Sequence, residues 1–517
     1  MITAYKTITN TVLLCMLTLA AVAQDQSAIQ KGLASVTTSS IGAHVNFLAS
    51  PLLEGRYTSE KGAMLASEYI ATMLAHYDVQ PAVTSSSGAK RSYFQNVNLF
   101  RYSVPTNLRM AIEAECETTI PTPNSDFFIY NKALYNGFSV GGQVVFVGYG
   151  LRLPEYGIDS YGQLDVRGKV VVVIPATKKN LLATSLATRG LNNEKISAIQ
   201  INQEEELKKR NPRAVVYLCP AEEVSRRNQL RNPTISPFDD LMGVAPESNS
   251  ASDLRIFLSK AMMAAALKEY GVALDSPIDI KSKAIQTRIK FSVSAEVSAA
   301  PLKDRNVLGV IHGEDTTRCI IVGAHYDHNG MFNGVIYPGA DDNASGVAGV
   351  LMLAKAMKES GIKPSVSILF ALWTGEEKGL VGSTYYVRNP VYPLTQTVMY
   401  VNYDMIGRNG LKDTAKLSAN FFYADSFSRV KEIVEANNAK LGGILNLCGT
   451  PTKGGNSSDY GPFSDCLVPF MGWTTGNHPD FHKPTDTADK IDPEKIQRIV
   501  KLSFLNLLDL SKEFGKR

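Results

Sequence analysis

The pattern of hydrophobic and polar positions divides the chain into stretches of different character. After residue 305, short apolar runs rich in β-branched residues alternate with stretches that carry apolar residues at helical spacing. Runs that are apolar at successive positions are typical of strands buried on both faces of a sheet. They lie at 306–311, 319–324, 365–372, 397–403 and 466–473, with helical patterns at 346–357, 427–441 and 493–514. This alternation predicts an α/β domain over 300–517 with a mostly parallel central sheet.

The stretch from 142 to 299 has a different texture, in which short β-rich runs are separated by polar or helical segments. We interpret it as a β-rich inserted domain. Before it, apolar positions at helical spacing between 41 and 77 surround the polar loop at 50–62, which predicts helices there.

The first 23 residues carry the pattern of a signal peptide. An apolar run at 11–23 follows Lys6 and ends in the small-x-small sequence Ala21-Val22-Ala23. The run is shorter than the about 20 residues that a spanning helix needs. An uncleaved anchor or a buried strand is the alternative to cleavage. We expect an exported protein, periplasmic or extracellular, with no stable membrane span after cleavage.

Composition excludes several classes of protein. The 517 residues include 53 Lys and Arg against 49 Asp and Glu, a formal net charge of +4 that is too small to gather nucleic acid. Beyond residue 23 the cysteines are odd in number and scattered, which argues against a disulfide scaffold. Cys448 and Cys466 are the one pair to test for a bridge, and independent burial of each is the alternative.

Polar side chains capable of metal chemistry stand directly after several of the predicted strands. Because the carboxyl ends of parallel strands form one crevice, we expect these side chains to converge. They are His325, Asp327 and His328 after 319–324, Glu376 and Glu377 after 365–372, Asp404 after 397–403, His482 beyond 466–473, and Asp341 ahead of the helix at 346–357.

Carboxylates gathered in one crevice repel one another and are costly to bury, which argues for a bound multivalent cation. Imidazole and carboxylate without thiolate favour Zn²⁺, with Mn²⁺ or Co²⁺ as alternatives, and the number of candidates fits two ions that share a carboxylate. Of the adjacent Glu376 and Glu377, one can bind metal and the other can act as general base on a metal-activated water. Asp327 can hold the far ring nitrogen of His325 and so fix the imidazole. Taken singly, each motif could also have no role in chemistry and be, for example, a helix-capping cluster or a solvated acidic loop.

The sequence resembles peptidase family M28, whose members include dinuclear zinc aminopeptidases and carboxypeptidases. The resemblance runs from about 300 to 517 through the motifs GAHYDH, GADDNASGVAGVLMLAKAM, LFALWTGEEKGLVGS, NYDMIGR, NSSDYGPF and HPDFHKPTDTADKID. It implies a three-layer phosphorylase/hydrolase-like catalytic domain. The segment LASPLLEGRYTSEKGAMLASEYIATML also resembles the N-terminal part of that domain in secreted members, so 24–141 would be the N-terminal part of the same catalytic domain as 300–517. The region 142–299 is more loosely similar to the protease-associated domain that some members insert.

Carried over by motif, the resemblance assigns a role to each candidate residue. His325 and Asp404 would bind one zinc, Glu377 and His482 the other, and Asp341 would bridge them. Glu376 would be the general base, and a cis peptide bond is expected between Asp341 and Asp342. Where many members have His after Ser-Asp, this chain has Tyr460, which could hydrogen-bond the oxyanion or simply pack.

The resemblance implies a secreted zinc exopeptidase that acts on peptides, with aminopeptidase as the first choice. Carboxypeptidase or dipeptidase relatives share the same ligands and stay as alternatives. A glutaminyl cyclase relative is a weaker alternative, because that enzyme lacks the histidine that matches His325. Receptor-like members that keep the fold without the chemistry lose metal ligands, whereas the ligands are present here. A peptide-binding scaffold in which the inserted domain does the work is the alternative from another class of protein.

Overall fold

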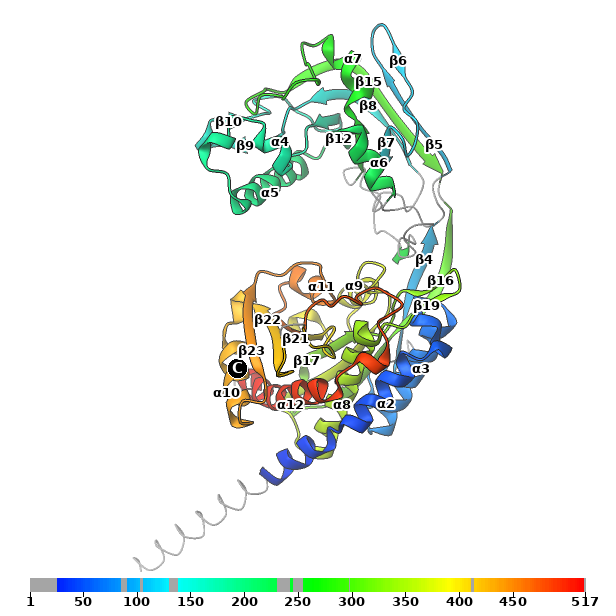
Figure 1. The fold of residues 1–517 in the computed structure, drawn as a ribbon, viewed down its shortest axis with the longest axis vertical. Helices are drawn as coiled ribbons and strands as arrows, with labels where there is room; N and C mark the ends of the chain where they lie inside the picture. Colours follow the sequence, from blue (N-terminus) through cyan, green and yellow to red (C-terminus); the bar gives the residue numbers. More distant parts are fainter. Residues whose placement is uncertain are drawn as a thin grey trace, which may run out of the picture. The chain divides into compact units, whose positions relative to one another are not determined.

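The computed structural model describes residues 26–84, 91–102, 106–129, 138–229, 242–244, 254–296, 298–410 and 413–515. The chain divides into two compact units, of which unit 1 comprises Met1–Leu99 and Leu302–Arg517 and unit 2 comprises Phe100–Pro301 (Figure 1). The predicted signal peptide at 1–23 lies outside the described residues. Among the residues that are described, none of the helices has the length and apolar character needed to cross a membrane.

Unit 1 is built on a mixed sheet with the strand order β4-β16-β20-β17-β21-β24-β22-β23. The pairs β20·β17, β17·β21 and β21·β24 are parallel, so the carboxyl ends of these central strands lie at one edge. The strands are β4 (Phe94–Tyr102), β16 (Ala299–Ile311), β17 (Asp315–His325), β20 (Val366–Trp373), β21 (Thr397–Tyr403), β22 (Ser418–Ala424), β23 (Asn446–Thr452) and β24 (Phe470–Thr474), with the short β1 (Gln80–Pro81), β2 (Val83–Thr84), β3 (Arg91–Ser92), β18 (Gly330–Phe332) and β19 (Val335–Tyr337) beside them.

Helices cover both faces of this sheet because its central strands are apolar at successive positions. In β20, Ile368 and Phe370 pack in one core cluster with residues of α2, α3, α8, α10 and α12, while Leu369 and Ala371 pack in another with residues of α9 and α11. The helices of unit 1 are α2 (Thr38–Leu48), α3 (Lys61–His76), α8 (Gly346–Ser360), α9 (Val381–Arg388), α10 (Arg429–Lys440), α11 (Tyr460–Asp465) and α12 (Pro493–Gly515), with the short helical turns η1 (Pro51–Arg56) and η6 (Ala340–Ser345). The predicted α/β character with a mostly parallel central sheet is confirmed.

The last predicted strand begins later than its apolar run suggested. The run starts at residue 466, but the strand β24 starts at Phe470. Cys466 caps α11, and Leu467 adopts a left-handed conformation (φ 60°) with 91% of its surface exposed. Apolar composition alone cannot distinguish such a turn from a strand. Cys466 and Cys448 are both free and exposed, so neither the bridge nor independent burial is found.

Unit 2 is also of mixed α/β construction, with the strand order β6-β5-β15-β8-β11-β12-β14-β7. Its strands are β5 (Thr106–Glu113), β6 (Thr118–Thr119), β7 (Phe127–Ile129), β8 (Phe138–Phe146), β11 (Val170–Val173), β12 (Ala214–Cys219), β14 (Arg255–Ser259) and β15 (Ile285–Glu296), with the short β9 (Arg152–Leu153) and β10 (Ile158–Asp159), and its helices are α4 (Lys178–Leu182), α5 (Asn193–Arg210), α6 (Ala221–Gln229) and α7 (Lys260–Lys268). The predicted start at residue 142 differs from the observed one at Phe100, because β5, which precedes residue 142, pairs with β15 near the far end of the unit. The predicted end at 299 differs from the observed one by two residues.

A buried histidine links α2 to α3 in unit 1. The ring nitrogens of His44 lie 2.8 Å from the Tyr69 hydroxyl and 3.0 Å from the Tyr77 hydroxyl. Burial, with a smaller contribution from the charge of Lys355, lowers the pKa of His44 to about 4. The folded protein therefore keeps this imidazole neutral at pH values where the unfolded chain protonates it.

We expect this histidine to make the protein less stable in mild acid. Between about pH 6.5 and pH 4 the unfolded chain binds a proton that the folded chain does not, so the free energy of unfolding falls as the pH falls, by at most about 3 kcal/mol. Urea unfolding of wild type and His44→Gln at pH 7.5 and pH 5 measures this loss, and the variant should lose less. His76→Gln, which changes an exposed histidine at the end of α3, is the matched control. Equal losses in wild type and His44→Gln would contradict the assignment.

Candidate metal centre

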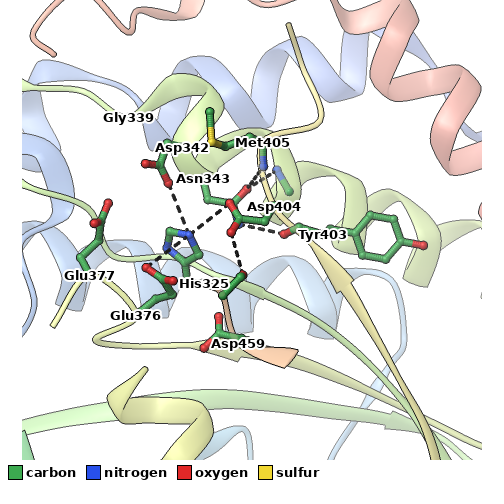
Figure 2. Close-up of polar contacts among 12 residues, drawn as sticks. His325, Gly339, Asp342, Asn343, Glu376, Glu377, Tyr403, Asp404, Met405 and Asp459 are labelled. Atoms are coloured by element: carbon green, nitrogen blue, oxygen red, sulfur yellow. Dashed lines mark hydrogen bonds and ion pairs between the residues drawn. The ribbon is translucent and has the colours of Figure 1, made fainter. Parts of the chain in front are cut away.

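The predicted metal-binding side chains lie together at the carboxyl edge of the parallel strands. His325 is the last residue of β17, Glu376 and Glu377 follow β20, and Asp404 follows β21. These strands are neighbours in the sheet, so the residues after them meet although they are far apart in sequence. Figure 2 shows His325 among the carboxylates of this group. The convergence expected from the sequence is therefore observed.

One group of side chains surrounds His325. Its Nε2 atom lies 3.4 Å from Asp342 Oδ1, 3.5 Å from Asp404 Oδ1 and 4.0 Å from Glu376 Oε2 (Figure 2). The His325 side chain is 1% exposed, whereas Asp404 and Glu376 are 20% and 14% exposed. The group is therefore closed behind the imidazole and open to solvent on the carboxylate side.

A second group surrounds Glu377. His482 Nε2 lies 2.9 Å from Asp342 Oδ2 and 3.3 Å from Glu377 Oε2. His328 Nδ1 lies 2.8 Å from the other oxygen of Glu377. The sequence placed His328 after the strand but gave it no role. Its HxDH spacing from His325 was the signal, and its complete burial against Glu377 places it in the site.

The residue shared by the two groups is Asp342 rather than Asp341, which corrects the sequence assignment. Asp342 directs Oδ1 to His325 and Oδ2 to His482. The cis peptide bond likewise lies between Asp342 and Asn343, one residue later than expected. Sequence could not separate the two aspartates, because both are acidic and adjacent and the turn η6 alone decides which one faces the site.

Asp341 is buried and holds neighbouring loops in place. Its Oδ1 accepts a hydrogen bond of 2.7 Å from the N–H of Gly407, and its Oδ2 lies 3.3 Å from His478 Nε2. Gly407 is three residues beyond Asp404, and His478 is four residues before His482. Asp341 thus connects the segments that carry two of the candidate ligands.

The expected hydrogen bond between the Asp327 carboxylate and His325 is not found. The His325 Nδ1 atom lies 3.2 Å from the backbone carbonyl of Asp327, while the Asp327 carboxylate is 3.8 Å away. The carboxylate instead accepts hydrogen bonds from the Glu376 backbone N–H at 3.1 Å and from the Thr58 hydroxyl at 2.9 Å. It therefore positions the backbone of Glu376, and the carbonyl orients the imidazole.

Asp404 receives a chain of hydrogen bonds whose direction is fixed. The Trp373 indole N–H donates to the Tyr400 hydroxyl at 2.9 Å, and that hydroxyl donates to Asn402 Oδ1 at 2.8 Å. Asn402 Nδ2 donates to Ser458 Oγ at 2.8 Å, which leaves the Ser458 proton for Asp404 Oδ2 at 2.7 Å. Since the indole and the amide nitrogen can only donate, every link runs toward Asp404. The chain fixes one carboxylate oxygen and leaves the other for a ligand.

The electrostatics of the site separate the two adjacent glutamates. Burial raises the pKa of Glu376 well above its usual range, although the charge of His325 opposes this shift. Burial and Asp342 act to raise the pKa of Glu377, but hydrogen bonds from His328 and His482 lower it to about 2. Glu377 is therefore held as a carboxylate, and Glu376 has the greater affinity for a proton.

The donor set fits divalent metal ions. Two clusters each offer three ligand atoms within 4.8 Å of one another, namely His325 with Glu376 and Asp404, and His328 with Asp342 and Glu377. Both consist of imidazole nitrogen and carboxylate oxygen, the donors that suit zinc. The buried Nε2 of His328 has no hydrogen-bond partner among the described residues. A cation here would relieve the repulsion among the carboxylates.

Tyr460 makes the contacts of a packing residue. Its hydroxyl lies 2.6 Å from the Ser457 hydroxyl, and its ring packs against Phe422 and Phe470. These contacts agree with the packing role that the sequence left as an alternative. The role in binding an oxyanion stays a prediction.

The comparisons with known proteins agree with the motifs. Residues 306–506 match the model of peptidase family M28, which confirms the resemblance over that stretch. Leupeptin-inactivating enzyme 1 of Streptomyces exfoliatus is 30% identical over 186 residues, which cover 36% of this chain and 38% of that protein. Leucine aminopeptidase 2 of Trichophyton rubrum is 32% identical over 179 residues, 33% of each chain. The chain therefore spans only about a third of the length of these curated relatives, 38% of the first and 33% of the second.

A solved structure shares the fold over most of the chain. The aminopeptidase from Aneurinibacillus sp. strain AM-1 superimposes with a TM-score of 0.51 at 19% identity, covering 92% of this chain and 95% of that one. At this identity the likeness concerns the fold alone. It is consistent with the mixed α/β construction described above.

Replacing Asp342 and Asp341 one at a time by asparagine tests whether Asp342 is the shared residue. We expect Asp342→Asn to weaken zinc binding by at least about tenfold, because both groups lose a charged oxygen. Asp341→Asn makes the same chemical change one residue earlier and keeps an acceptor for the Gly407 N–H, so it should weaken zinc binding much less than Asp342→Asn does. Zinc titration against a competing chelator measures both variants. A larger loss in Asp341→Asn would restore the original assignment.

Proposed function

We propose that this protein is a secreted dinuclear zinc exopeptidase, most simply an aminopeptidase that releases N-terminal residues from peptides. The observation that carries the proposal is Asp342, whose two carboxylate oxygens face two different groups of imidazole and carboxylate ligands. A shared carboxylate between two such groups is the arrangement of a two-metal hydrolase. The name leucine aminopeptidase, borne by the relative from Trichophyton rubrum, supports the aminopeptidase class.

Five side chains would hold the metal ions. His325 and Asp404 would bind one Zn²⁺, Glu377 and His482 would bind the other, and Asp342 would be shared. His328, whose Nδ1 lies 2.8 Å from Glu377 Oε1, would hold the Glu377 carboxylate in place or serve as a further ligand. Mn²⁺ or Co²⁺ could substitute, since both accept the same donors. Two zinc ions bound there would supply Lewis acidity at the scissile carbonyl and acidify a water molecule.

Glu376 is the residue that would move the proton. Its backbone is fixed by Asp327, and its side chain reaches toward His325 without being needed as the shared ligand. A carboxylate whose pKa is raised by burial accepts a proton from the attacking water and can return it to the leaving amine. The partly exposed carboxylates of Glu376 and Asp404 would also meet the free amine of the peptide.

The finer parts of the fold and the location of the protein belong to the same proposal. Unit 1 would be a three-layer phosphorylase/hydrolase-like domain, and unit 2 a protease-associated-like insertion within it. The pattern at 1–23 supports export to the periplasm or the extracellular space. Carboxypeptidase, dipeptidase, glutaminyl cyclase and non-catalytic binding relatives would each give a different result in the experiment below.

A pair of neighbouring variants tests the proposed division of labour. We expect Glu376→Gln to retain about two zinc ions per chain and to lose about 10²–10⁴-fold in kcat, because it loses only the base. Glu377→Gln, the matched control, should lose zinc as well as turnover. The measurements are elemental analysis and release of nitroaniline from aminoacyl-p-nitroanilides, with N-acetylated substrates alongside.

The substrate panel separates the proposal from its alternatives. Chelator-sensitive cleavage of free but not N-acetylated substrates supports an aminopeptidase. Cleavage only at the carboxyl end of peptides, or cyclisation of N-terminal glutamine, would replace it with a carboxypeptidase or a cyclase. Absence of turnover in a zinc-loaded wild type would indicate a binding protein.

A further inference from the structure

A fully buried arginine reaches the candidate metal centre from outside the stretch that matches the family model. Arg56 ends the short turn η1 in the N-terminal part of unit 1, whereas the match begins at residue 306. Its side chain is 0% exposed. The cost of burying a guanidinium is several kcal/mol unless its N–H groups find acceptors. Its partners therefore show what the surrounding structure is built to hold.

Those partners are backbone carbonyls. Arg56 Nε donates to the carbonyl of Tyr326 at 2.8 Å, and Nη2 donates to that of Gly339 at 2.9 Å. Nη1 donates to the carbonyl of Pro338 at 2.7 Å and also to that of Leu48. The planar guanidinium thus holds carbonyls from three separate segments of the chain at fixed relative positions.

Two of these segments carry metal-ligand candidates. Tyr326 directly follows His325, and Gly339 lies three residues before Asp342. The backbone takes part as well, since the carbonyl of Arg56 accepts the His328 N–H at 3.1 Å. A single residue therefore connects the segment that carries His325 and His328 to the segment that carries Asp342.

The backbone around Arg56 is fitted to this position. Gly55 adopts a left-handed conformation (φ 70°), and a Cβ atom there would lie 2.4 Å from the carbonyl oxygens of Gly330 and Tyr337. Gly339 (φ 59°) is similarly confined, because a Cβ would lie 2.4 Å from His328 Cγ. A side chain at either position would clash, so the backbone on both sides of these hydrogen bonds is tightly packed.

The segment before Asp342 is also held from its other side. The Asp486 carboxylate accepts the N–H groups of Asp341 and Asp342, with Oδ2 at 3.0 and 3.1 Å. Arg56 holds the carbonyls just before these amides. Arg56 therefore holds this short segment by its carbonyl oxygens, and Asp486 holds it by the N–H groups that follow.

We propose that Arg56 is a positioning residue of the metal centre, which sets the spacing between His325 and Asp342 by holding the backbone of both segments. The guanidinium touches neither metal ligand side chain, so it acts through the backbone. In its effect on metal binding this inference rests on the proposed zinc site. The fixing of the two segments is a property of the protein without metal.

Lysine cannot replace arginine in this role. An ammonium group keeps the charge, but its three N–H donors all leave from one nitrogen. It therefore cannot reproduce four hydrogen bonds that leave from three nitrogens spread across the guanidinium plane. Arg56→Lys therefore separates geometry from charge, and Arg56→Met removes both. Lys495→Met is a matched control, because Lys495 is also a fully buried cation of unit 1 and its partners, Asp413 and the Ser418 carbonyl, lie away from the metal ligands.

The test uses the full chain in two states. In metal-free protein, amide hydrogen exchange is followed in peptides that cover 326–330 and 338–343. In the presence of zinc, the dissociation constants are measured by chelator competition, and kcat and KM are measured on an aminoacyl-p-nitroanilide. Thermal unfolding of each variant records the general loss of stability.

The proposal requires a local effect at equal stability. For Arg56→Lys we expect at least about tenfold faster exchange in both peptides and at least about tenfold weaker zinc binding, with Lys495→Met unchanged in both despite a similar fall in Tm. If Arg56→Met does not fold, Arg56→Lys decides the matter. Unchanged exchange in Arg56→Lys, or equal effects in the Lys495→Met control, would overturn the proposal.

A failure of the zinc site itself would be recognised separately. If wild type binds no zinc, the proposed function fails, while the exchange data still show whether Arg56 fixes the two segments. If wild type binds zinc and Arg56→Lys binds it equally well, the positioning role is wrong and the function stands.

Discussion

The crowding of carboxylates in one buried crevice is the constraint around which unit 1 is arranged. Burial raises the pKa of Asp327 to about 6 and that of Asp459 to about 7, despite the opposing charge of His325. Glu376 is shifted in the same direction by the same cause. Such a cluster is costly to form unless a cation shares it, because like charges in a medium of low dielectric repel strongly. In the proposed metal centre, stability and metal binding would therefore be linked through the same side chains.

The fold meets this constraint by occupying the oxygens that face away from the crevice. The hydrogen-bond chain that ends on Asp404 needs space inside the sheet, and a Cβ atom at Gly323 would lie 2.6 Å from Trp373 Nε1 and 2.7 Å from the Tyr400 hydroxyl. The backbone N–H of Glu376 occupies one oxygen of Asp327. These fixed donors set the orientation of the carboxylates, so the remaining carboxylate oxygens and the imidazole nitrogens face the crevice. A preorganised site of this kind does not need to rearrange to receive an ion.

The sequence was informative where a single rule decides the structure. Polar residues at the ends of buried parallel strands had to meet, so His325, Glu377 and Asp404 could be found without coordinates. The choice between Asp341 and Asp342 depends on the local path of one turn, which periodicity does not encode. Nothing in the sequence indicated a role for Arg56, because its hydrogen-bond partners are backbone carbonyls. Every residue has a carbonyl, so no side-chain pattern marks these partners. The start of unit 2 was misplaced because strand pairing between distant segments has no local signature.

The interruption of unit 1 by unit 2 affects how unit 1 can be assembled. The strands that flank the interruption, β4 and β16, are neighbours in one sheet, so the chain leaves and returns at almost the same place. Loop-closure entropy rises only logarithmically, by about 0.6 kcal/mol per doubling of length, and a segment that folds on itself costs less than a loose one. The long excursion is therefore thermodynamically cheap, and the strands of unit 1 can keep their register although many residues intervene between β4 and β16.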